Sequence, residues 1–199
     1  MTKLPKTILT LVLFLFVSSP NVGQAVEFGL TPSTVYGMWK NINDAVLVYA
    51  NERSTNDTWI RNLENMPQDK FSGKAPANVL EQVTQFNTKL NEILQNKEAH
   101  LEELLLEGDL SNLLASSDDN LVTPSLVYMH SGQVLINIVE EIVHNSPTGI
   151  NISPFFDVDA FPDKTPSDVF SLVDLGLRYL DEILIRQEAG DLTTGKEPR

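Results

Sequence analysis

The chain of 199 residues contains no cysteine. This absence excludes disulfide bonds, a cysteine nucleophile and covalent haem attachment through a Cys-x-x-Cys-His motif. It also excludes a lipid-modified cysteine behind a leader peptide. A domain built from this chain must therefore take its stability from the packing of its core.

Basic side chains are scarce, because 14 lysine and arginine residues stand against 27 aspartate and glutamate residues, a formal charge of −13 at pH 7. An acidic surface repels nucleic acids and anionic lipid head groups, so we expect neither as a partner. Solubility alone is a sufficient reason for such a surface. The charge therefore excludes partners more clearly than it identifies one.

Sequence motifs of the common catalytic sites are missing as well. The chain has no Gly-x-Ser-x-Gly, His-Glu-x-x-His, Gly-x-Gly-x-x-Gly or lysine-containing phosphate-loop motif. We therefore predict a protein that is not an enzyme and that needs no cofactor.

A long, predominantly apolar run occurs only near the start of the chain. Lys3 and Lys6 precede the run 8–17, and small and polar residues follow up to Ala25. This order is typical of a secretory signal peptide, and we expect cleavage after Ala25. The run is short for a bilayer span, so we expect no stable membrane anchor after cleavage. The mature chain, with 12 basic and 27 acidic side chains, would carry a charge of −15 and be periplasmic or secreted.

One short motif occurs four times along the chain. Its copies are Thr31-Pro32-Ser33-Thr34-Val35-Tyr36, Ala75-Pro76-Ala77-Asn78-Val79-Leu80, Thr123-Pro124-Ser125-Leu126-Val127-Tyr128 and Thr165-Pro166-Ser167-Asp168-Val169-Phe170. A hydroxyl at the N-cap followed by proline at the first helical position predicts the start of a helix. Ala75 has no hydroxyl, so its helix must find another cap.

Apolar residues recur at helical spacing after each copy of the motif, which predicts four helices of about 18 to 22 residues. Trp59, Ile60 and Leu63 predict a short extra helix, and residues 97–114 predict a helix that is kinked or divided at Gly108. The segment 145–164 contains three prolines and several phenylalanines, so we expect a long loop packed on the helices.

These elements predict an all-α fold, and we favour a four-helix bundle built from four degenerate Thr-Pro-Ser-x-Val-Tyr/Phe repeats. The intervals of 44, 48 and 42 residues between motifs also suit a solenoid of helix pairs, but the second halves of the repeats differ. The spacing does not determine whether the helices run parallel or antiparallel. We expect a leader at 1–25, one domain at 26–187 and a polar tail at 188–199.

Several aromatic residues follow the helix starts, where they serve most simply as core. A sharper hypothesis is a pocket at one end of the bundle, with Gly132 making room for a small apolar ligand and the phenylalanine-rich loop as a lid. The candidate ligand-binding residues are Tyr36, Trp39, Tyr128, Gly132, Phe155, Phe156 and Phe170.

Glu141 and His144 stand three residues apart, as in half of a carboxylate-bridged di-iron site in a helical bundle. A complete site needs a second Glu-x-x-His pair, and neither His100 nor His130 belongs to one. A histidine near a helix C-terminus is also favourable without any metal.

We therefore predict an exported, non-enzymatic helical bundle that binds an envelope protein or senses a small apolar ligand. The alternative is a metal-binding bundle centred on Glu141 and His144, which His100 would complete. A purely structural, self-associating envelope protein is a third hypothesis.

Overall fold

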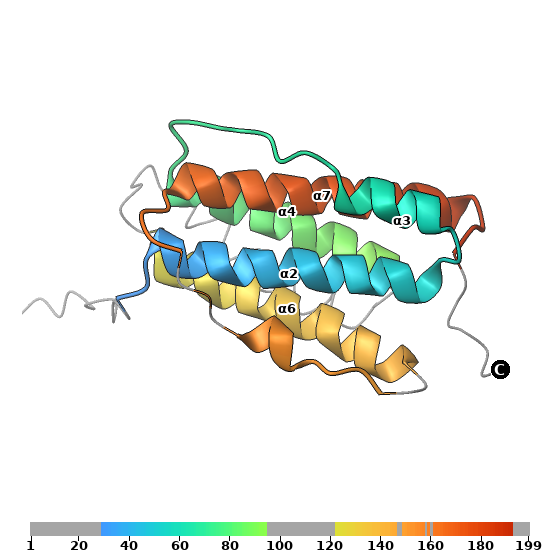
Figure 1. Cartoon of the computed structure of the whole chain (residues 1–199). Coiled ribbons are helices and arrows are strands. Elements are labelled where there is room, and N and C mark those ends of the chain that lie inside the picture. The colour runs from blue at the N-terminus through green and yellow to red at the C-terminus, as the bar shows by residue number, and fades with distance from the viewer. Residues whose placement is uncertain (1–28, 95–121, 147–148, 158, 160, 193–199) are drawn as a thin grey trace, which may run out of the picture.

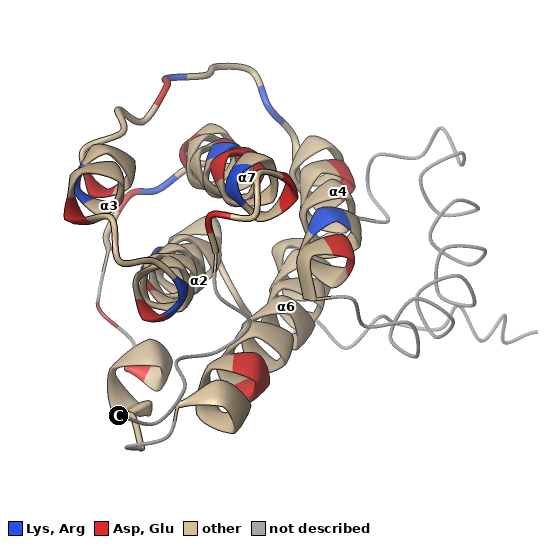
Figure 2. Ribbon diagram, turned by 90° about the vertical axis from the view of Figure 1, so that its right-hand side faces the viewer, with Lys and Arg blue, Asp and Glu red and all other residues tan. Residues whose placement is uncertain are grey.

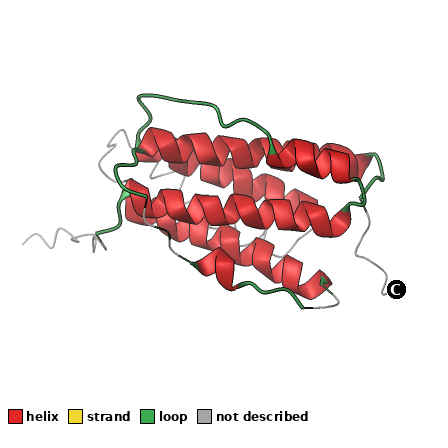
Figure 3. Cartoon of the chain, viewed as in Figure 1, coloured by secondary structure: helices red, strands yellow, loops and turns green. Residues whose placement is uncertain are grey.

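The computed structural model describes residues 29–94, 122–146, 149–157, 159 and 161–192. Over these residues it contains five α-helices, one 3-10 helix and no strand (Figure 3). The predicted all-α class is therefore confirmed for this part of the chain. The signal peptide, the predicted helix at 97–114 and His100 lie outside the described residues.

Each long helix begins at the proline of one motif copy. The four are α2 (Pro32–Arg53), α4 (Pro76–Leu94), α6 (Pro124–Asn145) and α7 (Pro166–Glu188). Proline suits the first helical position because its φ is already helical and its missing N–H would have had no partner there. The short predicted helix is α3 (Asp57–Glu64), which buries Trp59, Ile60 and Leu63, and η2 (Ser153–Phe156) is a single 3-10 turn.

Two of the predicted threonine caps form. The Thr165 hydroxyl accepts the N–H of Asp168 at 3.3 Å, and the Asp168 carboxylate accepts the Thr165 N–H at 2.8 Å, which completes a capping box. At α6, the Thr123 hydroxyl accepts the N–H of Leu126 at 3.3 Å. These contacts satisfy backbone donors that the first helical turn leaves unpaired.

The other two helix starts differ from this pattern. At α4 the Asn78 side chain accepts the Ala75 N–H at 3.0 Å, which is one half of a capping box, and the alanine side chain cannot form the other half. At α2 the Thr31 side chain makes no cap hydrogen bond to the backbone, and its hydroxyl lies 3.3 Å from that of Thr34.

All four long helices begin at the same end of the molecule (Figure 1). Their first prolines and the valines three residues later line one shared depression. The helices therefore run parallel, an orientation that the sequence did not determine. Helix α2 packs against α6 and α7, and α4 packs against the same two, so the order around the core is α2, α7, α4, α6 (Figure 2).

The centre of the core is fully buried and aromatic. Trp39 and Phe86 meet edge to face at 5.0 Å between ring centroids, a favourable geometry for an aromatic pair. The Trp39 ring N–H donates to the Ser131 hydroxyl at 2.9 Å, so the one polar group of this ring is satisfied inside the core. Ser131 is small enough to let the indole approach α6.

Because neighbouring long helices run parallel, the connections that the structure describes run back over about 30 Å of helix. Residues 65–75 return along α7, where Arg178 donates to the Pro67 carbonyl at 2.8 Å. The described residues between α6 and α7 return along α2, where the Asn41 side chain donates to the Asp157 carbonyl at 2.7 Å and η2 packs on the helix. The expectation of a long loop packed on the helices is confirmed for its described residues.

Candidate functional site

The end of the molecule where the helices start is closed by apolar side chains. The depression there has a volume of about 10 Å³ and is lined by four prolines and four valines: Pro32, Val35, Pro76, Val79, Pro124, Val127, Pro166 and Val169. A volume of this size is at the lower limit for a single water molecule. This depression at the proline end therefore holds at most a single water molecule.

The aromatic candidates do not share one cavity. Trp39 is fully buried in the core. Tyr36 packs against Phe161 with the centroids 5.2 Å apart, and Phe170 packs against Phe71 at 4.9 Å. The rings of Tyr36, Trp39 and Phe170 thus belong to three separate pairs.

The remaining candidates are dispersed in the same way. Phe155 is buried, whereas its neighbour Phe156 is 51 % exposed. Tyr128 is partly buried against the core. A Cβ added to Gly132 would meet only the terminal methyl group of Met38, at 4.0 Å, so there is free space beside α6 at this point.

A contact between neighbouring helices occurs twice in equivalent form. The Lys164 N–H, just before α7, donates to the Ser33 hydroxyl of α2 at 3.1 Å. The Lys74 N–H, just before α4, donates to the Ser167 hydroxyl of α7 at 3.0 Å. Ser33 and Ser167 follow the proline in their motif copies, so each clasp joins the start of one helix to the start of the next around the core.

Side chains strengthen both clasps. The Lys164 ammonium lies 4.6 Å from the Tyr36 ring centroid, and the Lys74 ammonium lies 4.2 Å from that of Phe170. Cations in this position are attracted by the ring face. Tyr36 and Phe170 occupy the same motif position, so the two lysines make equivalent contacts.

The sequence contains a signal for these clasps that the motif search did not use. Phe71 precedes Lys74 by three residues, and Phe161 precedes Lys164 by the same interval. The residue before each lysine, Gly73 or Asp163, has a positive φ of 69° or 59°. The second and fourth motif copies therefore resemble each other from four residues before their Ala-Pro or Thr-Pro pair.

Ser125 of α6 occupies the same motif position but makes no such clasp. It is 6 % exposed, and its hydroxyl has no hydrogen-bond partner in the described part of the molecule. The donors at Ser33 and Ser167 belong to the connections that lead into α7 and α4.

One face of α6 exposes large apolar side chains at intervals of seven residues. Met129, Ile136 and Val143 are 63 %, 45 % and 49 % exposed, and we call these three residues the open face of α6. Ile136 is twelve residues after the first proline of α6. Arg178 is twelve residues after the first proline of α7, and there the return connection covers the helix. Met129 corresponds in the same way to Gly37 of α2, which the connecting residue Asp159 covers.

The open face is also poor in charge. Helix α6 contains no lysine or arginine, and its two glutamates lie near its C-terminal end (Figure 2). One of them, Glu141, forms an ion pair with Arg53 of α2. Glu140 is therefore the one exposed carboxylate on this helix.

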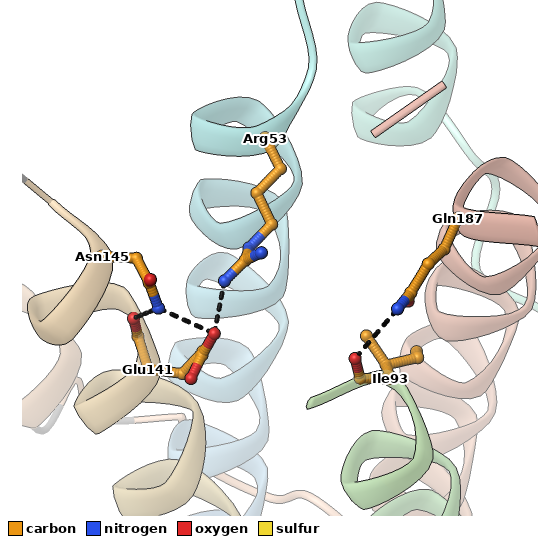
Figure 4. Close-up of polar contacts among 5 residues, drawn as sticks. All are labelled: Arg53, Ile93, Glu141, Asn145 and Gln187. Atoms are coloured by element: carbon orange, nitrogen blue, oxygen red, sulfur yellow. Dashed lines mark hydrogen bonds and ion pairs between the residues drawn. The ribbon is translucent and has the colours of Figure 1, made fainter. Parts of the chain in front are cut away.

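Glu141 lies within a polar cluster between α2 and α6 (Figure 4). Its Oε1 atom pairs with the Arg53 guanidinium and accepts the Asn145 side-chain N–H at 2.8 Å. The guanidinium also lies 4.5 Å from the ring centroid of Tyr49. Burial raises the pKa of Tyr49 to about 12, and the charge of Arg53 opposes this rise.

The two candidate metal ligands, Glu141 and His144, are not joined by further ligands among the described residues. The Glu141 carboxylate is engaged by Arg53 and Asn145, and His144 is exposed on the same helix. No group of three or more histidine and acidic side chains suited to a metal ion occurs among the residues with a described position. The proposed complement, His100, is not one of those residues.

A polar groove lies between α4 and α7. Its volume is about 580 Å³, and Lys89 and Asp181 among its lining residues form an ion pair. Near the ends of the same helices Gln187 donates to the Ile93 carbonyl at 3.3 Å (Figure 4). These contacts join α4 to α7.

The fold and these surfaces define an all-helical, bundle-like protein, and none of its described helices is both long and apolar enough to cross a membrane. The chain matches no protein-family model, no curated protein sequence and no solved structure.

Proposed function

We propose that the chain is an exported four-helix bundle of four degenerate repeats that acts as a non-enzymatic interaction module of the bacterial envelope. The signal-peptide pattern at residues 1–25 supports export. The parallel helix starts and the two equivalent clasps support the repeats, because side chains at the same motif positions make the same contacts.

The observation that carries the interaction role is the open face of α6. Full burial of a side chain such as Met, Ile or Val contributes about 1.5 to 3 kcal/mol, and here a row of three leaves much of this unrealised. Exposed apolar patches on an otherwise charged protein commonly mark interaction sites. The small-ligand form of the hypothesis has less support, because the aromatic candidates form separate pairs.

The test has two parts in one bacterial strain that carries the full chain with a C-terminal tag. Mass spectrometry of the protein released by osmotic shock should give a chain that begins at Val26. A photo-cross-linking residue at position 136 should then form a specific product in cells, whereas the same residue at position 185, another exposed isoleucine on α7, should not. Retention in the cytoplasm with residues 1–25 attached would contradict export, and equal cross-linking at both positions would contradict the interaction face.

A further inference from the structure

We propose that the partner of the open face of α6 is a second copy of this chain, bound antiparallel across a two-fold axis. This inference rests on the proposed interaction role and names the partner. Met129, Ile136 and Val143 form a row seven residues apart, and a heptad interval keeps such a row facing a partner helix.

The row is complementary to itself under a two-fold axis perpendicular to the helix. Ile136 is its midpoint, with Met129 seven residues before it and Val143 seven residues after it. An antiparallel copy therefore brings Ile136 against the partner's Ile136 and Met129 against the partner's Val143. Such an isologous contact closes at two copies and leaves no free binding surface of the same kind.

Charge decides which surface two copies can share. Each copy carries a formal charge of −13 as the full chain and −15 after the predicted cleavage, so two copies repel each other at long range. Exposed carboxylates on the other long helices include Asp44 on α2, Glu92 on α4 and Asp181 on α7. On α6 only Glu140 is exposed, because Glu141 is paired with Arg53. The open face is thus the place where a like-charged copy meets little repulsion.

The parallel helices favour the antiparallel pair. Each helix dipole is equivalent to roughly half a positive charge at its start and half a negative charge at its end. The four helix starts lie together at the proline end, so their partial charges add. An antiparallel copy sets the proline end of one molecule beside the opposite end of the other, which is the attractive arrangement.

The contact is small, because one helix of 22 residues supplies the face on each side. A single helix pair falls at the low end of specific interface sizes, so we expect a dissociation constant on the order of 10 μM. Gly132 has no side chain and free space beside it, so the backbones of the two paired α6 helices can approach each other there.

Disulfide trapping tests the geometry directly, since the chain has no native cysteine. Under mild oxidation Ile136→Cys should form a covalent dimer at least about tenfold faster than the control Ile185→Cys on α7. Met129→Cys should cross-link to Val143→Cys in a mixture of the two variants and only slowly to itself. Fast self-cross-linking of Met129→Cys would overturn the antiparallel arrangement.

Sedimentation analysis of the full mature chain provides the equilibrium measurement. The unmodified protein and the matched control Ile185→Glu should dimerise with similar dissociation constants, and Ile136→Glu should weaken the dimer at least about 30-fold. Circular dichroism checks that each variant is folded. A chain that remains monomeric up to about 200 μM overturns the proposal.

The two proposals fail separately. An exported monomer that cross-links at position 136 to a different protein overturns the second copy and leaves the interaction role intact. A chain that is not exported contradicts the proposed function, whatever its oligomeric state.

Discussion

At Gly176, α7 lies close against side chains of α2 and α4. A Cβ placed there would lie 2.5 Å from the Asn43 side-chain oxygen and 2.8 Å from the Phe86 ring. These atoms are buried and have little freedom to move, so Gly176→Ala should lower the free energy of unfolding by about 1 to 3 kcal/mol. Urea denaturation followed by circular dichroism measures the change.

Gly132 provides the matched control for that substitution. The nearest atom to an added Cβ there is the flexible end of Met38, at 4.0 Å. Gly132→Ala should leave stability unchanged or raise it by up to about 1 kcal/mol, because alanine favours the helix. Equal losses at Gly132 and Gly176 would contradict this account of close packing.

Asp168 couples the cap of α7 to pH. Hydrogen bonds from the side chain and backbone of Thr165 lower the pKa of Asp168 below its ordinary value of 3.8. Its stabilising contribution is therefore complete above the unfolded pKa and is lost as the pH falls through the lower folded pKa.

When the pH is lowered from 7 to about 3, the free energy of unfolding of Asp168→Asn should therefore fall by less than that of the unmodified protein. Asparagine can still accept the Thr165 N–H, so the variant changes the charge and retains an acceptor. Urea midpoints at the two pH values provide the test, and identical losses in both proteins would exclude Asp168 as a source of acid sensitivity.

At the scale of helices, the serine clasps hold successive starts together. Ser167→Ala removes the acceptor of the Lys74 N–H and should lower the free energy of unfolding by about 1 kcal/mol. Ser125→Ala is the matched control at the same motif position. The Ser125 hydroxyl is buried without a described partner, so its removal should be neutral or stabilising. Chemical denaturation of both variants decides, and a larger loss for Ser125→Ala would contradict the clasp.

The helix starts could be predicted from the sequence because capping and proline geometry act within a few residues. The prolines at 32, 76, 124 and 166 each begin a helix, and the short helix at Trp59 follows from local spacing. The clasps join Lys164 to Ser33, which are 131 residues apart, so no local pattern could identify the pair. Their upstream Phe-x-x-Lys spacing is recognisable only after the contact is known.

The candidate site was less predictable because exposure depends on distant chain segments. Met129 and Ile136 read as ordinary apolar residues of an amphipathic helix, and the described return connections run along α2 and α7 instead of over them. Arg53, the ion-pair partner of Glu141, belongs to a helix 88 residues earlier. A local Glu-x-x-His pattern could not show that the glutamate was already paired.

The whole molecule has 27 acidic and 14 basic side chains, and repulsion among the excess negative charges opposes the folded state. The Debye length falls from about 30 Å at 0.01 M ionic strength to about 8 Å at 0.15 M. The urea midpoint should therefore rise between these two sodium chloride concentrations. Replacing the exposed Glu81 and Glu92 with lysine should flatten the dependence, and a midpoint that falls with salt would contradict the role of net charge.

The diagonal placement of α2 and α4 also decides the order in which the protein can fold. Both neighbours of α2 come later in the chain, and Asn43 reaches its acceptor, the Leu172 carbonyl, across 129 residues. A nascent chain that ends after α4 thus has two long helices that lie on opposite sides of the finished core. Contacts between such distant residues slow folding, so the core closes only when α7 has been synthesised. Late completion of the core would keep the nascent chain open for longer, which suits the export proposed above.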